Sequence, residues 1–209
     1  MSAAPEYELD EQETQKQYNY PVPPPGGWKA EHLDRLPNLP RRTELIDGSL
    51  VFMSPQTKFH MRTISLLEVC LRSQAPDELD VYREFTVRLD EENRPEPDVL
   101  VALTEADTGP KGTWLKAEDV VLAIEVVSDD SVTRDREVKP RKYANADIPH
   151  FWRVEESEGL PVVYVYELDP ATSSYAISGI HHDKLELKVP FDISIDLTAI
   201  NKRRPAADS

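Results

Sequence analysis

The strongest constraint on the fold is the segment from Val120 to Val127, which is apolar at every position except Glu125. So continuous an apolar run is typical of a central strand that is covered on both faces of its sheet. An unpaired carboxylate in such a strand is costly, so Glu125 must have a raised pKa or lie against a cation. The segment therefore predicts a covered sheet with a charged group buried in it.

A second apolar strand begins with a carboxylate, which is also costly to bury without a partner. Pro97-Asp98 leads directly into the run from Val99 to Ala102. If this strand neighbours the one that carries Glu125, the two carboxylates converge, and Mg²⁺ or Mn²⁺ would relieve their repulsion because these cations prefer oxygen ligands. The alternative is structural: Asp98 ends its strand at the surface and Glu125 pairs with an arginine.

The remaining patterns define the elements around these strands. Asp47-Gly48 separates two apolar runs within 44–53, which indicates a β-hairpin, and Ser54-Pro55 favours the start of a helix over 54–73. We also expect a short helix over 28–36, strands over 79–89, 97–103, 120–127 and 148–154, and an antiparallel meander over 162–168, 174–177, 184–187 and 191–197. These elements predict an α/β (α+β) fold: a mixed central sheet flanked by helices, with an antiparallel β-rich C-terminal part.

Pro140 constrains where the next helix begins. A proline deep inside a helix removes a hydrogen bond and clashes with the preceding turn, at a cost of ~3 kcal/mol. The helix is therefore expected to start near Asp135 or Arg136, which places Lys139 in its first turn. Lys139 then shares a stripe with Tyr143, whereas Lys142 aligns with the more polar side.

Composition limits the classes of protein. The 24 Lys and Arg against 39 Asp and Glu give a net charge of −15, which argues against a protein that coats nucleic acid. No stretch is apolar enough for a membrane span or a signal peptide, and a single cysteine, Cys70, excludes an internal disulfide, so we expect a cytoplasmic protein without a membrane partner. The expected organisation is a disordered acidic and proline-rich tail over 1–27, one domain over 28–198, and a flexible C-terminal tail over 199–209.

Several short motifs follow one another along the middle of the chain. They are Thr43-Glu44-Leu45-Ile46-Asp47-Gly48, Pro95-Glu96-Pro97-Asp98, Ile124-Glu125-Val126-Val127-Ser128, Asp135 followed by Lys139, and Tyr143-Ala144 running into Ile148-Pro149-His150-Phe151-Trp152-Arg153-Val154. Pro97-Asp98, a glutamate on a buried strand and a lysine beyond it resemble the PD-(D/E)XK nuclease superfamily. The whole series resembles the Uma-two family of putative restriction endonucleases over roughly residues 30–197.

The resemblance implies a restriction-endonuclease-like fold with a catalytic site of Glu44, Asp98 and Glu125 around Mg²⁺ or Mn²⁺ and Lys139 as their basic partner. The chain departs from the superfamily pattern at Val127, where that pattern has lysine. The resemblance therefore implies that Lys139 reaches the site from the helix, with Lys142 as the second candidate. His60 is a candidate site-lining residue, although a hydrogen-bonded core histidine is the competing interpretation.

Two functions follow. One is a Mg²⁺-dependent endonuclease that hydrolyses DNA phosphodiester bonds; the other is a catalytically silent protein of the same fold that acts as a binding or regulatory module. The dense basic run formed by Arg134, Arg136, Lys139, Arg141 and Lys142 could contact a DNA backbone or be a solvated helix face. His181-His182-Asp183 is better explained as a polar turn than as a metal cluster. Homodimerisation is left open.

Overall fold

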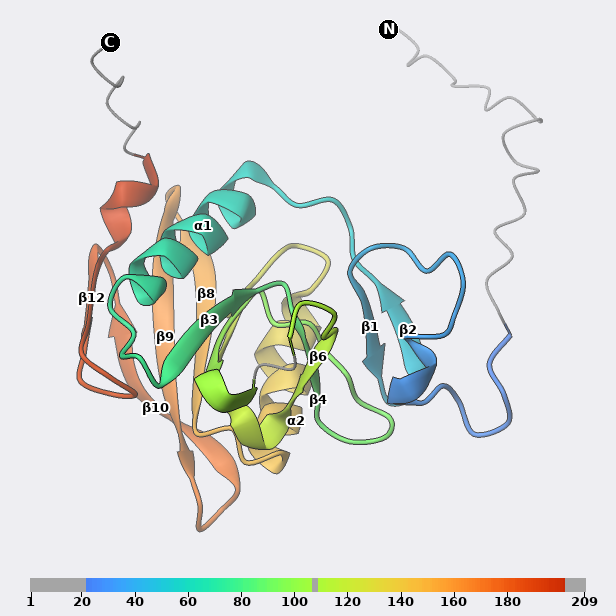
Figure 1. The fold of residues 1–209 in the computed structure, drawn as a ribbon. Coiled ribbons are helices and arrows are strands. Elements are labelled where there is room, and N and C mark those ends of the chain that lie inside the picture. The colour runs from blue at the N-terminus through green and yellow to red at the C-terminus, as the bar shows by residue number, and fades with distance from the viewer. Residues whose placement is uncertain (1–21, 107–108, 202–209) are drawn as a thin grey trace, which may run out of the picture.

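The computed structural model describes residues 22–106 and 109–201 and is built on a mixed six-stranded sheet (Figure 1). The order across the sheet is β10-β9-β8-β7-β5-β3, and β7–β8 is its one parallel pair. The strands are β3 (Leu79–Arg83), β5 (Val99–Leu103), β7 (Val120–Val126), β8 (His150–Ser157), β9 (Leu160–Asp169) and β10 (Ser174–His181). The expected mixed α+β fold is confirmed, and β7 lies inside the sheet as its apolar sequence requires.

Each face of the sheet packs against a different helix (Figure 1). α1 (Lys58–Arg72) buries Ile64, Leu67 and Leu71 against one face, together with Leu122 and Ile124 of β7. The alternate residues of the same strand, Ala123 and Glu125, point to the other face, which α2 (Lys139–Asn145) covers. The twofold alternation of a strand thus aims Glu125 at the helix that carries Lys139.

An irregular turn precedes α2, the helix that carries Lys139. Residues Arg134–Val138 form a π-helical turn, and the regular helix α2 starts at Lys139 with Pro140 in its first turn. The helical segment begins earlier than the expected start near Asp135 or Arg136, because residues 132 and 133 are already helical. The π-helical turn lies directly before Pro140, which has no N–H to continue a regular helix ladder.

The hairpin of β1 (Thr43–Ile46) and β2 (Ser49–Phe52) stands beside the sheet (Figure 1). Its turn residues Asp47 and Gly48 both have positive φ, 49° and 70°, as a two-residue turn of this kind needs. β1 is tied to the rest of the domain through backbone hydrogen bonds between Leu45 and Arg94. These bonds hold Glu44 of β1 close to the sheet.

Smaller elements complete the domain. β4 (Thr86–Arg88) pairs in parallel with β6 (Trp114–Lys116), and β11 (Lys184–Leu187) pairs with β12 (Ile193–Asp196). Short helical turns span Ala30–His32, Thr104–Ala106, Ala117–Asp119 and Leu197–Asn201. Among the described residues, no helix has the length and apolar character needed to cross a membrane.

Three boundaries differ from the sequence expectation. The strand expected over 79–89 breaks into β3 and β4 because Glu84 has a φ of 49°, which strands do not adopt. α1 starts at Lys58 instead of after Ser54-Pro55, since Thr57 is the residue whose side chain accepts the capping bond from the His60 backbone. The helix expected over 28–36 is reduced to the turn Ala30–His32.

Candidate active site

Four carboxylates and one ammonium group come together where β1, β5, β7 and α2 meet. They belong to Glu44, Asp98, Glu125, Asp135 and Lys139, and each of these residues is at most 3% exposed. Glu44 comes from the hairpin, Asp98 immediately precedes β5, and Glu125 lies on β7. The two acids that the sequence singles out, Asp98 and Glu125, therefore do meet at one end of neighbouring strands.

Lys139 is the cation at the centre of this group. Its Nζ lies 2.7 Å from Glu44 Oε1, 3.0 Å from Glu125 Oε2 and 3.6 Å from Asp135 Oδ1. Burial favours the neutral amine, but the surrounding carboxylates outweigh it and raise the pKa of Lys139 well above its ordinary value. The three acids therefore favour the charged ammonium form of the side chain.

Glu125 has two different partners. Oε2 takes the Lys139 ion pair, and Oε1 accepts a hydrogen bond of 2.5 Å from the hydroxyl of Tyr143. Burial raises the pKa of Glu125 well above its ordinary value, with the Lys139 charge opposing the rise. Burial and the nearby acids also raise the pKa of Tyr143, so its hydroxyl keeps the proton that it donates.

Asp98 is held by a separate set of donors. Oδ2 accepts the Val126 backbone N–H at 2.7 Å and lies 3.3 Å from His60 Nε2, while Oδ1 accepts a bond from Arg42 Nη2 at 3.0 Å. Burial alone would raise the pKa of Asp98, but the His60 bond, the nearby charges and the Val126 N–H lower it. Asp98 is thus the carboxylate of the group held ionised by its neighbours.

Arg42 marks the side of the site that reaches solvent. Its side chain is 20% exposed and lies 3.0 to 3.5 Å from Asp98, Glu96 and Glu84. Burial raises the pKa of Glu96 to about 7 even though Arg42 opposes the shift. The solvent-facing side of the site therefore combines one guanidinium with two carboxyl groups, those of Glu96 and Asp98, whose pKa values are shifted in opposite directions.

The structure brings together most, but not all, of the residues expected at the site. Lys139, not Lys142, contacts the acids; Lys142 turns to Asp47 at 2.5 Å. His60 lines the site through its contact with Asp98, and its buried Nδ1 has no hydrogen-bond partner among the described residues. Asp183 has a positive φ of 48° after β10, which fits the polar turn expected at 181–183.

The dense basic run expected near α2 does not form one surface. Lys139 is buried among the acids, Arg134 contacts Met53, and Arg136 pairs with Glu155. Arg141 extends to solvent beside Glu137. The π-helical turn and α2 spread these side chains around the helix axis, which corrects the idea of a single basic face.

Three residues of the site were not singled out by sequence reasoning. Asp135 was noted only as part of a motif, although its position four residues before Lys139 on a helix predicts their contact. The sequence predicts that Tyr143 shares a stripe with Lys139 but assigns it no role, and it contains no signal for Arg42. Arg42 has a φ of 60° just before β1, a conformation that its sequence does not announce.

The donor set suits a hard divalent cation. All four acids offer oxygen ligands, and the buried Glu44 Oε2 has no hydrogen-bond partner among the described residues. Burial raises the pKa of Asp135 and of Glu125, because the interior disfavours their ionised forms, and a bound cation would favour those forms. In the described part of the chain, however, no three of these side chains are already arranged around one metal position. The chemistry fits a metal, while Lys139 occupies the space between the acids.

Comparisons with known proteins identify the family and the fold. The family model Uma2, described as "Putative restriction endonuclease", matches residues 30–199. One solved structure, described as a putative nuclease belonging to DUF820 from Anabaena variabilis, has 16% sequence identity and a TM-score of 0.60, over 82% of this chain and 98% of that chain. At that identity the likeness shows the fold. No match was found among functionally curated proteins.

Proposed function

The chain belongs to the Uma2 family of putative restriction endonucleases, and from this premise we propose that it is a divalent-metal-dependent endonuclease that hydrolyses DNA phosphodiester bonds. The observation that carries the proposal is the buried group of Glu44, Asp98 and Glu125 with Lys139 among them. Carboxylates in excess of cations, beside a fixed ammonium, are the residue types that such a reaction uses.

Each member of the group has a role in this proposal. Glu44, Asp98 and Glu125 would hold Mg²⁺ or Mn²⁺. The ion would lower the pKa of a bound water and neutralise charge on the phosphoryl oxygens. Lys139 would orient the nucleophilic water and the phosphate through its ammonium protons. Tyr143 fixes one oxygen of Glu125 by its hydroxyl bond, so that the other oxygen faces Lys139.

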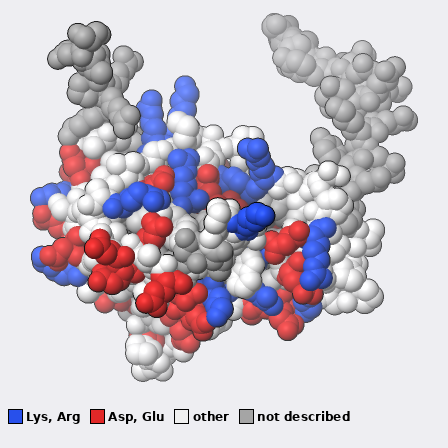
Figure 2. Space-filling model, viewed as in Figure 1, with Lys and Arg blue, Asp and Glu red and all other residues white. Residues whose placement is uncertain are grey.

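Access to the site is expected from the side of Arg42. The acids are buried, whereas Arg42 reaches solvent and can exchange its carboxylate partners for a phosphate. The net charge of −15 opposes the approach of a polyanion, so local Lys and Arg groups must provide the attraction. On the face shown in Figure 2, Lys and Arg side chains are interspersed with Asp and Glu side chains, and several of them gather towards the top of the view.

The deciding experiment is a cleavage assay on plasmid and single-stranded DNA with Mg²⁺ or Mn²⁺. Asp98→Asn and Glu125→Gln keep the size of each side chain and remove its charge, so we expect both variants to lose cleavage and Mn²⁺ binding measured by calorimetry. Asp192→Asn and Glu118→Gln, at exposed carboxylates, are matched controls that should behave as the unchanged protein. Circular dichroism checks that all variants fold.

The alternative function is a catalytically silent binding or regulatory module, which the near-complete burial of the acids favours. It predicts that the folded protein shows no metal-dependent nicking under any condition tested. Full Mn²⁺ binding by Asp98→Asn or Glu125→Gln would overturn the assignment of the site itself.

A further inference from the structure

A cavity of about 490 Å³ opens on the α2 side of the sheet, between α2 and the turn that joins β9 to β10. Its floor is aromatic: the ring centroid of Phe151 lies 5.6 Å from that of Tyr166 and 5.5 Å from that of Tyr175. The Tyr175 hydroxyl donates to the Ile148 carbonyl at 2.7 Å, which fixes its ring. The volume lies within the roughly 300–1,000 Å³ typical of small-molecule sites.

Three arginines, Arg136, Arg141 and Arg153, line the walls of this cavity. The side chain of Arg141 is 75% exposed, and its partner among the described residues is Glu137, at 3.5 Å. Arg136 binds Glu155 through Nε and Nη2, and its Nη1 has no partner in the described part of the chain. Guanidinium N–H donors therefore remain available at the rim for an anion.

Arg153 joins the rim to the aromatic floor. Its guanidinium carbon lies 4.5 Å from the ring centroid of Tyr164 and 5.6 Å from that of Tyr166. This stacking holds the guanidinium flat against the strand surface. The cavity thus presents fixed ring faces beside positive charge.

The cavity borders the acid centre without sharing its residues. Glu125 of β7 is in register with Arg153 of β8, and registered partners on neighbouring strands point to the same face, about 4.8 Å apart. Pro140 and Ala144 of α2 line the cavity, whereas Lys139 and Tyr143 of the same helix contact Glu125. The helix therefore separates the acid centre from a cavity whose lining carries three arginines and one glutamate, Glu137. Arg153 shares Glu155 with Arg136, so one carboxylate pairs with two of these guanidinium groups.

We propose that this cavity binds one nucleotide unit of a nucleic-acid strand, with its base against Tyr166 and its phosphate at Arg136 and Arg141. The choice of nucleic acid as the ligand rests on the proposed function; the ring faces and guanidinium groups carry the rest. Every base has a π-face, so an aromatic floor binds bases with little sequence preference. Arginine presents a planar fork of donors that matches a phosphate.

The test is the binding of a fluorescein-labelled oligothymidylate to the full chain in EDTA, followed by anisotropy at several salt concentrations. Arg141→Glu should weaken binding roughly tenfold and lower the salt dependence, because a phosphate contact is replaced by repulsion. Tyr166→Leu should also weaken binding, by roughly tenfold, but leave the salt dependence unchanged, because stacking is lost and no charge is.

Arg35→Glu is a matched control for Arg141→Glu. Arg35 is 74% exposed and pairs with Glu31 four residues earlier, as Arg141 pairs with Glu137, but it lies outside the cavity. Arg35→Glu makes the same change in net charge without removing a contact in the cavity, so added repulsion should weaken binding by no more than about twofold. Equal losses in the two variants would show an effect of net charge alone and would overturn the proposal.

Competitors distinguish a nucleotide from a simple anion. Thymidine monophosphate should displace the oligonucleotide at concentrations where inorganic phosphate does not, and equal competition by phosphate would overturn the role of the rings. The result is separable from the proposed function. Cleavage lost in Asp98→Asn while Arg141→Glu binds normally would remove the cavity proposal alone. Cleavage retained in Asp98→Asn while Arg141→Glu fails to bind would remove the catalytic assignment alone.

Discussion

Lys139 is the residue on which the charge balance of the interior depends. It is buried and faces Glu44, Glu125 and Asp135, which have no other cation within ion-pairing distance among the described residues. Buried ions are tolerated only when each is compensated, because the low-dielectric interior neither hydrates nor screens them. One ammonium group therefore permits several carboxylates to remain in the core.

Replacing Lys139 by methionine should destabilise the protein strongly. Lys139→Met keeps most of the volume but leaves the acids uncompensated, which typically costs about 3–5 kcal/mol when one partner of a buried pair is removed. Urea unfolding measures the loss. Lys142→Met is the control: Lys142 pairs with the exposed Asp47, and we expect a loss below about 1 kcal/mol. Comparable losses in both variants would contradict the central position of Lys139.

Asp34 gives a prediction about pH. Burial raises the pKa of its carboxyl, but hydrogen bonds from Arg94 at 2.8 and 3.0 Å and from Thr113 outweigh this and hold the pKa below 3.8. A carboxyl with a lowered pKa in the folded state adds stability above its unfolded pKa, and that stability is lost as the pH falls through the folded value.

The variant Asp34→Asn should therefore lower the free energy of unfolding by about 1 kcal/mol at pH 7, after allowance for the partial solvent exposure of the carboxylate. The difference from the unchanged protein should shrink as the pH is lowered below 3.8. Urea unfolding at pH 7 and pH 3 measures both. A difference that grows in acid would refute the assigned sign.

The residues that sequence reasoning identified are those that violate a strong rule. Glu125 stands out because a carboxylate interrupts a buried strand, and Asp98 stands out for the same reason. Arg42 could not be found this way, because its partners Glu84, Glu96 and Asp98 are brought to it by tertiary folding. A polar residue at the start of a strand breaks no local pattern.

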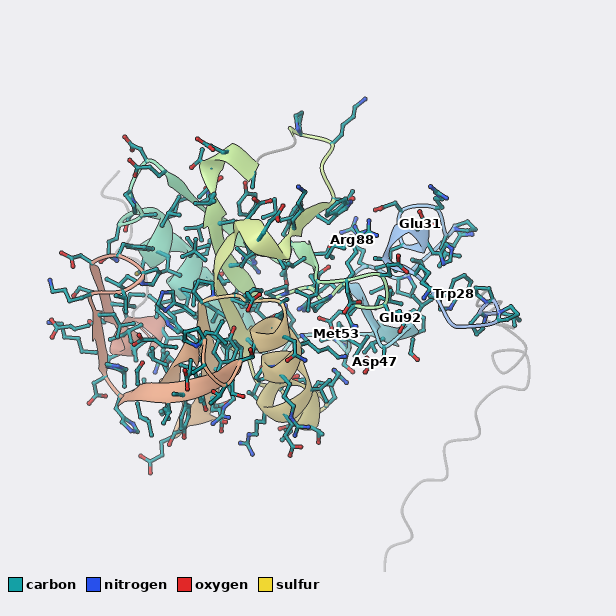
Figure 3. All side chains as sticks on the ribbon, turned by 90° about the horizontal axis from the view of Figure 1, so that it is seen from below. Trp28, Glu31, Asp47, Met53, Arg88 and Glu92 are labelled. Atoms are coloured by element: carbon teal, nitrogen blue, oxygen red, sulfur yellow. The ribbon has the colours of Figure 1, made fainter. Side chains whose placement is uncertain are left out.

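At the scale of the secondary-structure elements, the β1–β2 hairpin contacts the helical segment of Lys139 at its turn and at its end. Asp47 contacts Lys142, and Met53 contacts Arg134 through its sulfur. Figure 3 shows both Asp47 and Met53 on the side of the hairpin that faces α2, with Trp28 on its far side. Because the hairpin carries Glu44 into the centre, its opening would expose the acids.

The contact between the hairpin and α2 can be tested by removing the charge on Asp47. Asp47→Asn removes the ion pair with Lys142 but keeps a residue type that accepts positive φ at the turn. We expect backbone amides of 43–52 to exchange with deuterium several-fold faster while the global unfolding free energy changes little. Asp192→Asn, which breaks an exposed ion pair elsewhere, should leave this segment unchanged. Equal exchange in all three proteins would show that the pair does not hold the hairpin.

The elements were predicted best where a residue forbids alternatives. Asp47-Gly48 predicts a tight turn, and this is confirmed. Pro140 excludes a regular helix through its position, and a π-helical turn precedes it, but the helical segment begins before the predicted start near Asp135 or Arg136. The break at Glu84 was missed because its positive φ accompanies ion pairs with Arg42 and Arg83, which are contacts made only after folding. The cap at Thr57 was missed because Ser54-Pro55 offers an equally good local signal.

For the molecule as a whole, the strand order is the part that sequence patterns leave open. Periodicity shows that β7 is covered on both faces, but it does not show that β8 runs parallel beside it while β5 lies on its other side. These pairings join segments far apart in the chain and depend on how both helices pack. Only the resemblance to a known family could supply them before the structure.

The negative net charge of the whole molecule leads to a prediction about how its affinity for DNA depends on salt. A protein that neutralises 6–10 phosphates loses roughly 10³–10⁵ in affinity for duplex DNA between 50 and 200 mM salt. Here the net charge is −15 and the cations near α2 are dispersed over separate ion pairs, so we expect few phosphate contacts. Added salt also screens the general repulsion, which partly offsets the loss of those contacts.

We therefore expect the affinity of the full chain for a labelled 30-base-pair duplex in EDTA to fall by only about tenfold over that range. Fluorescence anisotropy titrations at 50, 100 and 200 mM salt measure the slope. Arg35→Glu should bind more weakly at every salt concentration with a similar slope, since it adds repulsion without removing a contact. A loss of about a thousandfold would mean that a basic surface forms on binding, and that the acidic character of the free molecule does not govern its encounter with DNA.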